Sequence, residues 1–257
     1  MKARPSVKRF VAVAALAAGL LGGAAAQAAE LRVLSAGALE PAMAAAAGGF
    51  HRRTGHILRI EYATATAIRE RAVTGLSAGL VAAPDTVVAE LAQAGKVAGE
   101  PPAGFGRVGM GVAVRTGAPV PDISTVAALK ATLLGAGTVI YNRASSGTNV
   151  EAMVQALGIA QALAPRTQRY PDATAVMTRL IGGGPDEVAL GAVTAIGLYR
   201  DKGVRLVGPV PAAVQSYTVY TAAAVHAADP VAHAFLDYLA SPGARALIAE
   251  AGVEPAG

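Results

Sequence analysis

Short apolar segments rich in strand-forming residues alternate with helical patterns along this chain, and this alternation constrains the fold more than any other feature of the sequence. Strands are predicted at 31–35, 57–62 and 80–83, and helices follow them at 38–53, 65–74 and 84–96. Strands that alternate with helices indicate parallel β–α–β units rather than an antiparallel sandwich. The sequence therefore predicts an α/β fold.

Two longer predicted strands, 107–115 and 215–225, interrupt this rhythm. Between them the pattern predicts strands at 138–141, 188–190 and 204–207 and helices at 126–134, 147–157, 173–181 and 195–202, and after them only helices, at 230–240 and 243–251. The chain is therefore expected to leave one lobe, build a second and return. This predicts a first lobe of residues 30–112 plus 216–257 and a second lobe of residues 113–215. Two shared strands form a hinge, which lets two lobes close on a ligand.

The N-terminus has the pattern of a secretory signal peptide. Four basic residues (Lys2, Arg4, Lys8, Arg9) precede an apolar run at 10–21, and a stretch of small residues at 22–29 contains Ala26-Gln27-Ala28. The apolar run is shorter than a membrane span requires, so cleavage is favoured over an uncleaved anchor. Residues 1–29 are predicted to be removed, and the mature chain is expected in the periplasm.

Charge and composition exclude several classes of function. The predicted leader holds four of the 22 basic side chains and none of the 17 acidic ones, which leaves 18 basic against 17 acidic from Glu30 onwards. A nearly neutral chain lacks the clustered basic residues that nucleic-acid binding needs. The chain has no cysteine, so neither a disulfide nor a thiolate metal site can form. The four histidines show no metal-ligand spacing, and no nucleotide-binding or nucleophile-elbow motif is present. We expect a monomer that uses no cofactor and no metal.

Small and hydroxyl-bearing residues follow four of the predicted strands. Ligands of open α/β sheets bind beyond the carboxyl ends of the strands, so these loops are the candidate site. They contain Ser35-Ala36-Gly37-Ala38, Thr64-Ala65-Thr66, the segment 142–149 with Arg143, Ser145, Ser146, Gly147 and Thr148, and the segment 192–195 with Thr194. Each loop alone is explained by helix capping, because Ser and Thr are preferred N-caps. Four such loops at one cleft favour a ligand.

The chemistry of these loops indicates an anion. Helix N-termini present unpaired backbone N–H groups and the positive end of the helix dipole, and small side chains let an anion approach them. Hydrogen bonds to an ionised acceptor contribute about 1.5–3 kcal/mol each, against about 0.3–1 kcal/mol from one helix dipole. We therefore expect the hydrogen bonds to determine selectivity.

The order of these segments resembles the periplasmic molybdate-binding proteins of ABC importers. The resemblance rests on 31–39, the loop at 62–66, the segment 190–194 followed by 203–207, and 234–242 near the C-terminus. It implies the type II periplasmic binding protein fold, with two Rossmann-like lobes joined by two crossing strands and a cleft between them. It also implies capture of a small anion and delivery to an inner-membrane permease.

At the ligand loops the chain departs from that family. Ala38 and Thr194 stand where the family has a serine and a tyrosine, and Gly79 stands where it has an aspartate. Loss of the serine and the tyrosine removes donors for a tetrahedral oxyanion, whereas Arg143 offers a planar fork to a carboxylate. A solvent-exposed Arg143 is the simpler alternative. The sequence predicts an organic carboxylate rather than molybdate as the ligand.

Two other functions remain open at this stage. A sensor module would bind the same ligand and signal to a receptor. A hydrolase on the same frame would use Ser35 or Ser145 as the nucleophile, but no histidine lies in the loops to act as its base. The sequence favours a binding protein that is not an enzyme.

Overall fold

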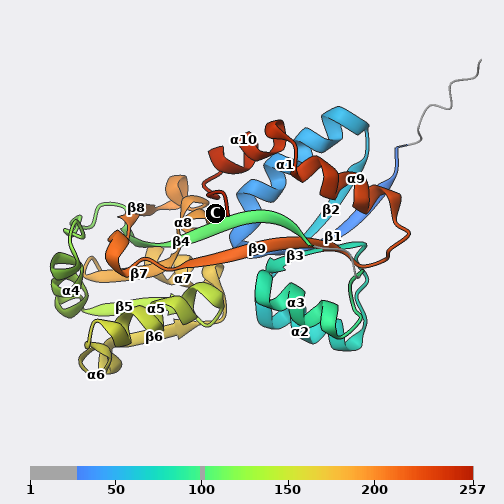
Figure 1. The fold of residues 1–257 in the computed structure, drawn as a ribbon. Coiled ribbons are helices and arrows are strands. Elements are labelled where there is room, and N and C mark those ends of the chain that lie inside the picture. The colour runs from blue at the N-terminus through green and yellow to red at the C-terminus, as the bar shows by residue number, and fades with distance from the viewer. Residues whose placement is uncertain (1–27, 99–101, 257) are drawn as a thin grey trace, which may run out of the picture.

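The computed structural model describes residues 28–98 and 102–256, and within these ranges nine strands form one continuous sheet covered by helices (Figure 1). The strands are β1 (Glu30–Ala36), β2 (Ile57–Ala63), β3 (Leu80–Pro84), β4 (Ala103–Arg115), β5 (Thr138–Asn142), β6 (Thr167–Tyr170), β7 (Glu187–Ala192), β8 (Val204–Pro209) and β9 (Tyr217–Ala224). The helices are α1 (Glu40–Thr54), α2 (Ala65–Thr74), α3 (Asp85–Gln93), α4 (Val126–Gly135), α5 (Ser145–Ala156), α6 (Ala160–Leu163), α7 (Ala173–Ile181), α8 (Val193–Gly197), α9 (Pro230–Leu239) and α10 (Pro242–Glu250). Residues 1–27 of the predicted signal peptide lie outside the described ranges.

The strand order is β2-β1-β3-β9-β4-β7-β5-β6, with β8 paired to β4. Strand β1 runs parallel to β2 and β3, and β5 runs parallel to β6 and β7. The predicted β–α–β units are therefore confirmed. Strands β4 and β9 run antiparallel to each other through the middle of the molecule (Figure 1).

Strand β4 pairs with both halves of the sheet. Its first part, from Ala103 to Gly109, pairs with β9, whereas the part from Met110 to Arg115 pairs with β7 and β8. We name the part built around β1, β2 and β3 the first lobe and the part built around β5, β6 and β7 the second lobe. The exact lobe boundaries predicted from the sequence, 30–112 plus 216–257 and 113–215, remain a prediction.

Helices cover both faces of each lobe. In the first lobe α1, α9 and α10 pack on one face, and α2 and α3 pack on the other. In the second lobe α4, α5 and α6 lie on one face, and α7 and α8 on the other. Every residue of β3 and β7 is buried, which explains why both segments, apart from Glu187 at the start of β7, are uncharged and show no polar–apolar alternation.

Several predicted bounds differ from the structure. The predicted strand at 215–225 begins at Tyr217, because the side-chain amide of Gln215 bonds the N–H and the carbonyl of Met110 at 2.7 and 2.9 Å and replaces a backbone pair. The helix predicted at 195–202 starts at Val193, ends at Gly197 and is followed by a separate 3₁₀ turn at 200–202. Strand β6 was not predicted; it is a four-residue edge strand without buried positions, so no apolar run marks it.

Candidate functional site

A cavity of about 320 Å³ lies between the lobes, where the strands of both lobes end, and we call it the cleft. The loops that follow β1, β2, β5, β6 and β7 line it. From the first lobe these loops contribute Ala36, Gly37, Ala38, Thr64 and Ala65, and from the second lobe Asn142, Ala144, Ser145, Ser146, Asp172, Ala173, Thr174, Ala192 and Ala195. A cavity at the carboxyl ends of the strands is where open α/β sheets bind ligands.

Helices α2, α5 and α7 begin at this cleft. Their first residues, Ala65, Ser145 and Ala173, all line it. The first N–H groups of an α-helix have no acceptor inside the helix, so they are available to a bound group. Three helix N-termini from two lobes therefore present positive partial charge to one cavity.

Two side chains cap these helices from their own termini. The Oγ1 of Thr64 accepts from the N–H of Ala67 at 3.2 Å, and the Oδ1 of Asp172 accepts from the N–H of Ala175 at 2.9 Å. The capping predicted for the Ser and Thr residues of these loops is present at Thr64, and Asp172 caps α7 in the same way. Each cap satisfies the third N–H of its helix and leaves the first two for a ligand.

Asn142 organises the turn between β5 and α5, and sequence analysis did not single it out. This buried side chain accepts from the N–H groups of Ala144 and Gly147 at 2.9 and 3.2 Å, and its Nδ2 donates to the Ser146 hydroxyl at 3.0 Å. A Cβ on Gly147 would lie 1.7 Å from the Asn142 carbonyl oxygen, so this position requires glycine. An asparagine that ends a buried strand before a Ser-rich turn was the available signal.

Of the predicted site residues that do not line the cleft, three are buried in its wall. Ser35 is fully buried and donates its hydroxyl to the Ala36 carbonyl at 3.3 Å. Thr194 is also buried and donates to the Ala38 carbonyl at 2.6 Å, which links α8 to the turn after β1. Gly147 is buried against Asn142. The two hydroxyls bond to backbone carbonyls inside the wall, and Gly147 packs against Asn142. In this structure the three residues therefore do not face the cleft, contrary to the expectation from the sequence.

Thr66, Arg143 and Thr148 line a second cavity, of about 400 Å³, that adjoins the cleft. We call this cavity the outer chamber. It shares Ala65 and Pro84 of the first lobe and Ala144 and Ser145 of the second lobe with the cleft. The predicted loop residues are therefore divided between two neighbouring cavities.

Ionisable side chains that sequence analysis did not name also line the cleft: Glu40, Tyr62, Tyr199, Lys202 and Tyr220. Burial, with a smaller effect of the negative charge of Glu40, raises the pKa of Tyr62 to about 12, and burial raises the pKa of Tyr220 to about 12. Both phenols are therefore neutral at physiological pH. The Tyr62 hydroxyl donates to the Glu40 carbonyl at 3.3 Å. These residues lie far apart in the sequence, and none belongs to a recognisable motif.

No cluster of three or more His, Cys, Asp or Glu side chains suited to a metal ion occurs within residues 28–98 and 102–256. In the same ranges, no helix has the length and apolar character needed to span a membrane.

Comparison with known proteins agrees with this architecture. The family described as bacterial extracellular solute-binding protein matches residues 31–254. The chain belongs to this family. Among solved structures, the periplasmic molybdate-binding protein of Azotobacter vinelandii aligns with a TM-score of 0.71 at 18% identity, covering 88% of this chain and 100% of that one. The sulfate-binding protein SubI of Mycobacterium tuberculosis H37Rv aligns with a TM-score of 0.71 at 20% identity, covering 88% and 87%. The predicted type II periplasmic binding fold and the family resemblance are confirmed.

One relative of this solute-binding protein is named as an enzyme. Aconitate isomerase from a Pseudomonas species is 31% identical over 243 residues, covering 88% of this chain and 87% of the relative. The chain is therefore similar to a protein named for a reaction as well as to structural neighbours named for binding.

Proposed function

We propose that this protein is a periplasmic solute-binding protein that closes its two lobes over a small organic anion and delivers it to the permease of an ABC importer. The observation that carries the proposal is the meeting of three helix N-termini, from both lobes, at one cleft. Backbone N–H groups held in this way bind anions without a charged side chain. The predicted signal peptide supports the periplasmic location, and we expect the protein to act as a monomer.

The ligand is proposed to be a carboxylate rather than molybdate. The cleft residues proposed to contact it are Ala36, Gly37, Ala38, Thr64, Ala65, Ser145 and Ser146. Tyr62 and Tyr220 supply apolar ring surface and neutral phenols beside these donors. A cleft with aromatic walls suits a ligand that has a carbon skeleton, and the relative named for aconitate, a tricarboxylate, points in the same direction.

Thermal unfolding in the presence of candidate anions tests this proposal. The panel contains acetate, succinate, tricarballylate, cis-aconitate, molybdate, tungstate, sulfate and phosphate. A ligand present at 100 times its Kd stabilises the folded protein by about 2.7 kcal/mol. We expect at least one carboxylate to raise the melting temperature more than any inorganic oxyanion does. A larger response to micromolar molybdate would refute the assignment to carboxylates.

Isomerase activity is a second candidate function, favoured by the 31% identity to aconitate isomerase. Isomerisation of an unsaturated acid requires a group that accepts and returns a proton. The half-buried carboxylate of Glu40 lines the cleft, and among the described residues no hydrogen bond or ion pair occupies its oxygens. Incubation with cis-aconitate, followed by chromatography, tests this function. Protein-dependent conversion that Glu40→Gln abolishes while binding persists would establish an enzyme. Binding without conversion would leave a binding protein.

A further inference from the structure

The cleft and the outer chamber form one elongated site. They adjoin along a wall contributed by Ala65 and Pro84 on one side and by Ala144 and Ser145 on the other. Their volumes, about 320 and 400 Å³, each exceed what a compact tetrahedral oxyanion fills. A ligand with two charged ends and a short carbon chain fits this shape better than a single compact ion.

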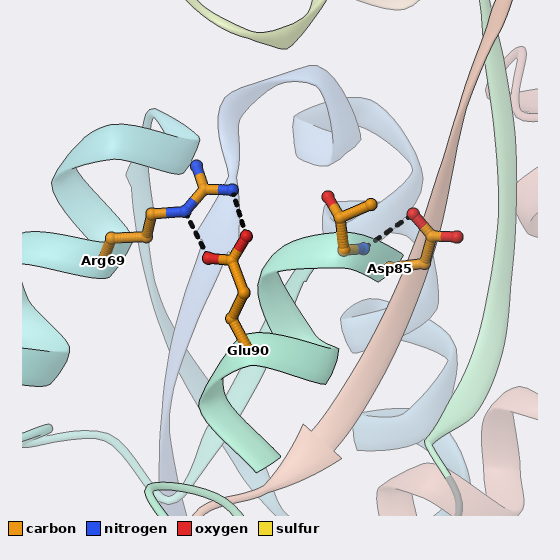
Figure 2. A network of polar contacts seen from close by, with 4 residues as sticks. Arg69, Asp85 and Glu90 are labelled. Atoms are coloured by element: carbon orange, nitrogen blue, oxygen red, sulfur yellow. Dashed lines mark hydrogen bonds and ion pairs between the residues drawn. The ribbon is translucent and has the colours of Figure 1, made fainter. Parts of the chain in front are cut away.

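One arginine of the outer chamber is already neutralised by a partner. The Nε and Nη2 of Arg69 donate to the two carboxylate oxygens of Glu90 at 2.6 and 3.0 Å, which ties α2 to α3 (Figure 2). This hydrogen bond raises the pKa of Arg69 and lowers the pKa of Glu90. The pair carries no net charge, so Arg69 brings no uncompensated positive charge to the chamber.

Arg143 differs from Arg69 because its guanidinium is free. Its backbone N–H donates to the Tyr170 carbonyl at 2.8 Å, which fixes the main chain. Among the described residues, no hydrogen bond, ion pair or ring contact involves its exposed side chain. The outer chamber therefore holds a positive charge on a fixed backbone, and its five donors have no acceptor within residues 28–98 and 102–256.

Asp85 places a negative charge in the same chamber. Its Oδ1 accepts from the Thr86 N–H at 2.7 Å, and its carboxylate points away from the Arg69–Glu90 pair (Figure 2). This negative charge repels a bound anion, so an anion binds in the chamber only if a positively charged side chain contacts it directly. Arg143 is the lining residue able to supply it.

We propose that the outer chamber is a second anion subsite, in which Arg143 binds the distal carboxylate of an elongated ligand. The inference rests on the proposed function and deepens it, because it identifies the ligand class as dicarboxylates and tricarboxylates. One carboxylate lies at the helix N-termini of the cleft, and the other reaches the guanidinium fork, which matches carboxylate geometry.

Isothermal titration with succinate and butyrate tests the subsite, because these acids have the same chain length and differ by one carboxylate. A hydrogen-bonded charge pair contributes about tenfold or more in affinity. We expect succinate to bind at least about tenfold more tightly than butyrate. Arg143→Gln should remove this preference by weakening succinate about tenfold while butyrate changes less than about twofold. Asp85→Asn should tighten succinate, because it removes a like charge.

Arg205→Gln is the matched control, since Arg205 is also an exposed arginine of the second lobe and lines none of these cavities. Arg143→Lys, which keeps the charge and loses the fork, should give an intermediate affinity for succinate. An unchanged ratio of succinate to butyrate affinity in Arg143→Gln would overturn the subsite while leaving the proposed function intact. Equal weakening of both acids would also overturn it, since Arg143 would then contact the shared carboxylate. Failure of every anion of the panel to bind would refute the proposed function and the subsite together.

Discussion

Single residues at the turn between β5 and α5 determine whether the cleft forms. The side-chain Oδ1 of Asn142 accepts hydrogen bonds from the N–H groups of Ala144 and Gly147. A Cβ on Gly147 would lie 1.7 Å from the backbone carbonyl oxygen of Asn142 and overlap it. The turn therefore depends on one buried polar side chain and on one missing side chain.

Gly147→Ala is predicted to destabilise the protein by about 2 kcal/mol or more, because overpacking against backbone forces the turn to shift. Gly37→Ala is the control, because a Cβ at Gly37 meets no atom within 4 Å. Urea unfolding of the two variants checks the prediction. Equal stability of Gly147→Ala and Gly37→Ala would show that the turn relaxes freely.

The two cleft tyrosines, buried Tyr220 and partly buried Tyr62, predict a loss of stability at high pH. The pKa of both Tyr62 and Tyr220 is raised to about 12, mainly by burial, whereas an unfolded tyrosine ionises near about pH 10. Above about pH 10 the unfolded chain releases protons that the folded chain retains, so the free energy of unfolding falls between about pH 10 and 12 and is unaffected below that range.

Urea unfolding from pH 8 to 12 measures this fall. Tyr220→Phe should reduce the slope of this fall, because it removes a phenol that ionises in this pH range mainly in the unfolded chain. Tyr217→Phe serves as an exposed comparison. A slope that Tyr220→Phe leaves unchanged would contradict burial as the cause.

Sequence identified the residue types of the site better than their positions. Thr64, Ser145 and Ser146 line the cleft as expected from strand-to-helix loops, whereas Ser35 and Thr194 point into the wall. Strand β1 is buried on both faces near Ser35, so alternation carried no information about which side faces the cavity. The contribution of Tyr62 and Tyr220 depends on tertiary packing and had no local signal.

At the scale of elements, most strands and helices follow from the sequence pattern. The fully buried β3 and β7 and the capped helices α2 and α7 have strong local signals. Strand β6 has none, because its polar residues pair at the exposed edge of the sheet. The partners of β4 also depend on the assembled fold, since its two parts pair with different strands.

Two ion pairs between elements differ in burial and are predicted to differ in strength. Arg179 of α7 binds Glu187 of β7 through two hydrogen bonds, one of 2.8 Å, and the Glu187 side chain is only 6% exposed. In the Arg69–Glu90 pair both side chains are 42–53% exposed. Removing one partner from a buried pair leaves an uncompensated charge, whereas an exposed pair contributes little.

Arg179→Leu is therefore expected to destabilise the protein by about 3 kcal/mol. Arg69→Leu is the matched variant and should cost at most about 1 kcal/mol. Denaturant unfolding of the two variants checks this order. If Arg69→Leu lowered the free energy of unfolding more than Arg179→Leu does, the ion pair between α2 and α3 would contribute more to stability than the buried pair, which would contradict the prediction.

For the whole molecule, we expect the lobes to close about β4 and β9, and we expect the hydrogen bond from the Thr194 hydroxyl to the Ala38 carbonyl to limit this movement on one side. Ala192 and Ala195 pack into the core cluster of the first lobe, although Ala192 ends β7 and Ala195 lies in α8, both of the second lobe. We expect the lobes to move about this contact, so that closure narrows the cleft and the outer chamber together. The sequence predicted two lobes and a cleft between them, but this contact between the lobes required the structure.

The central claim is that backbone N–H groups of both lobes bind one anion. Titration of the ¹⁵N-labelled protein with succinate, followed by amide chemical shifts, tests it most directly. We expect the largest shifts at Ala65 and Thr66 of α2, Ser145 and Ser146 of α5 and Ala173 of α7, with one common Kd. Shifts confined to one lobe, or centred away from these helix N-termini, would contradict it.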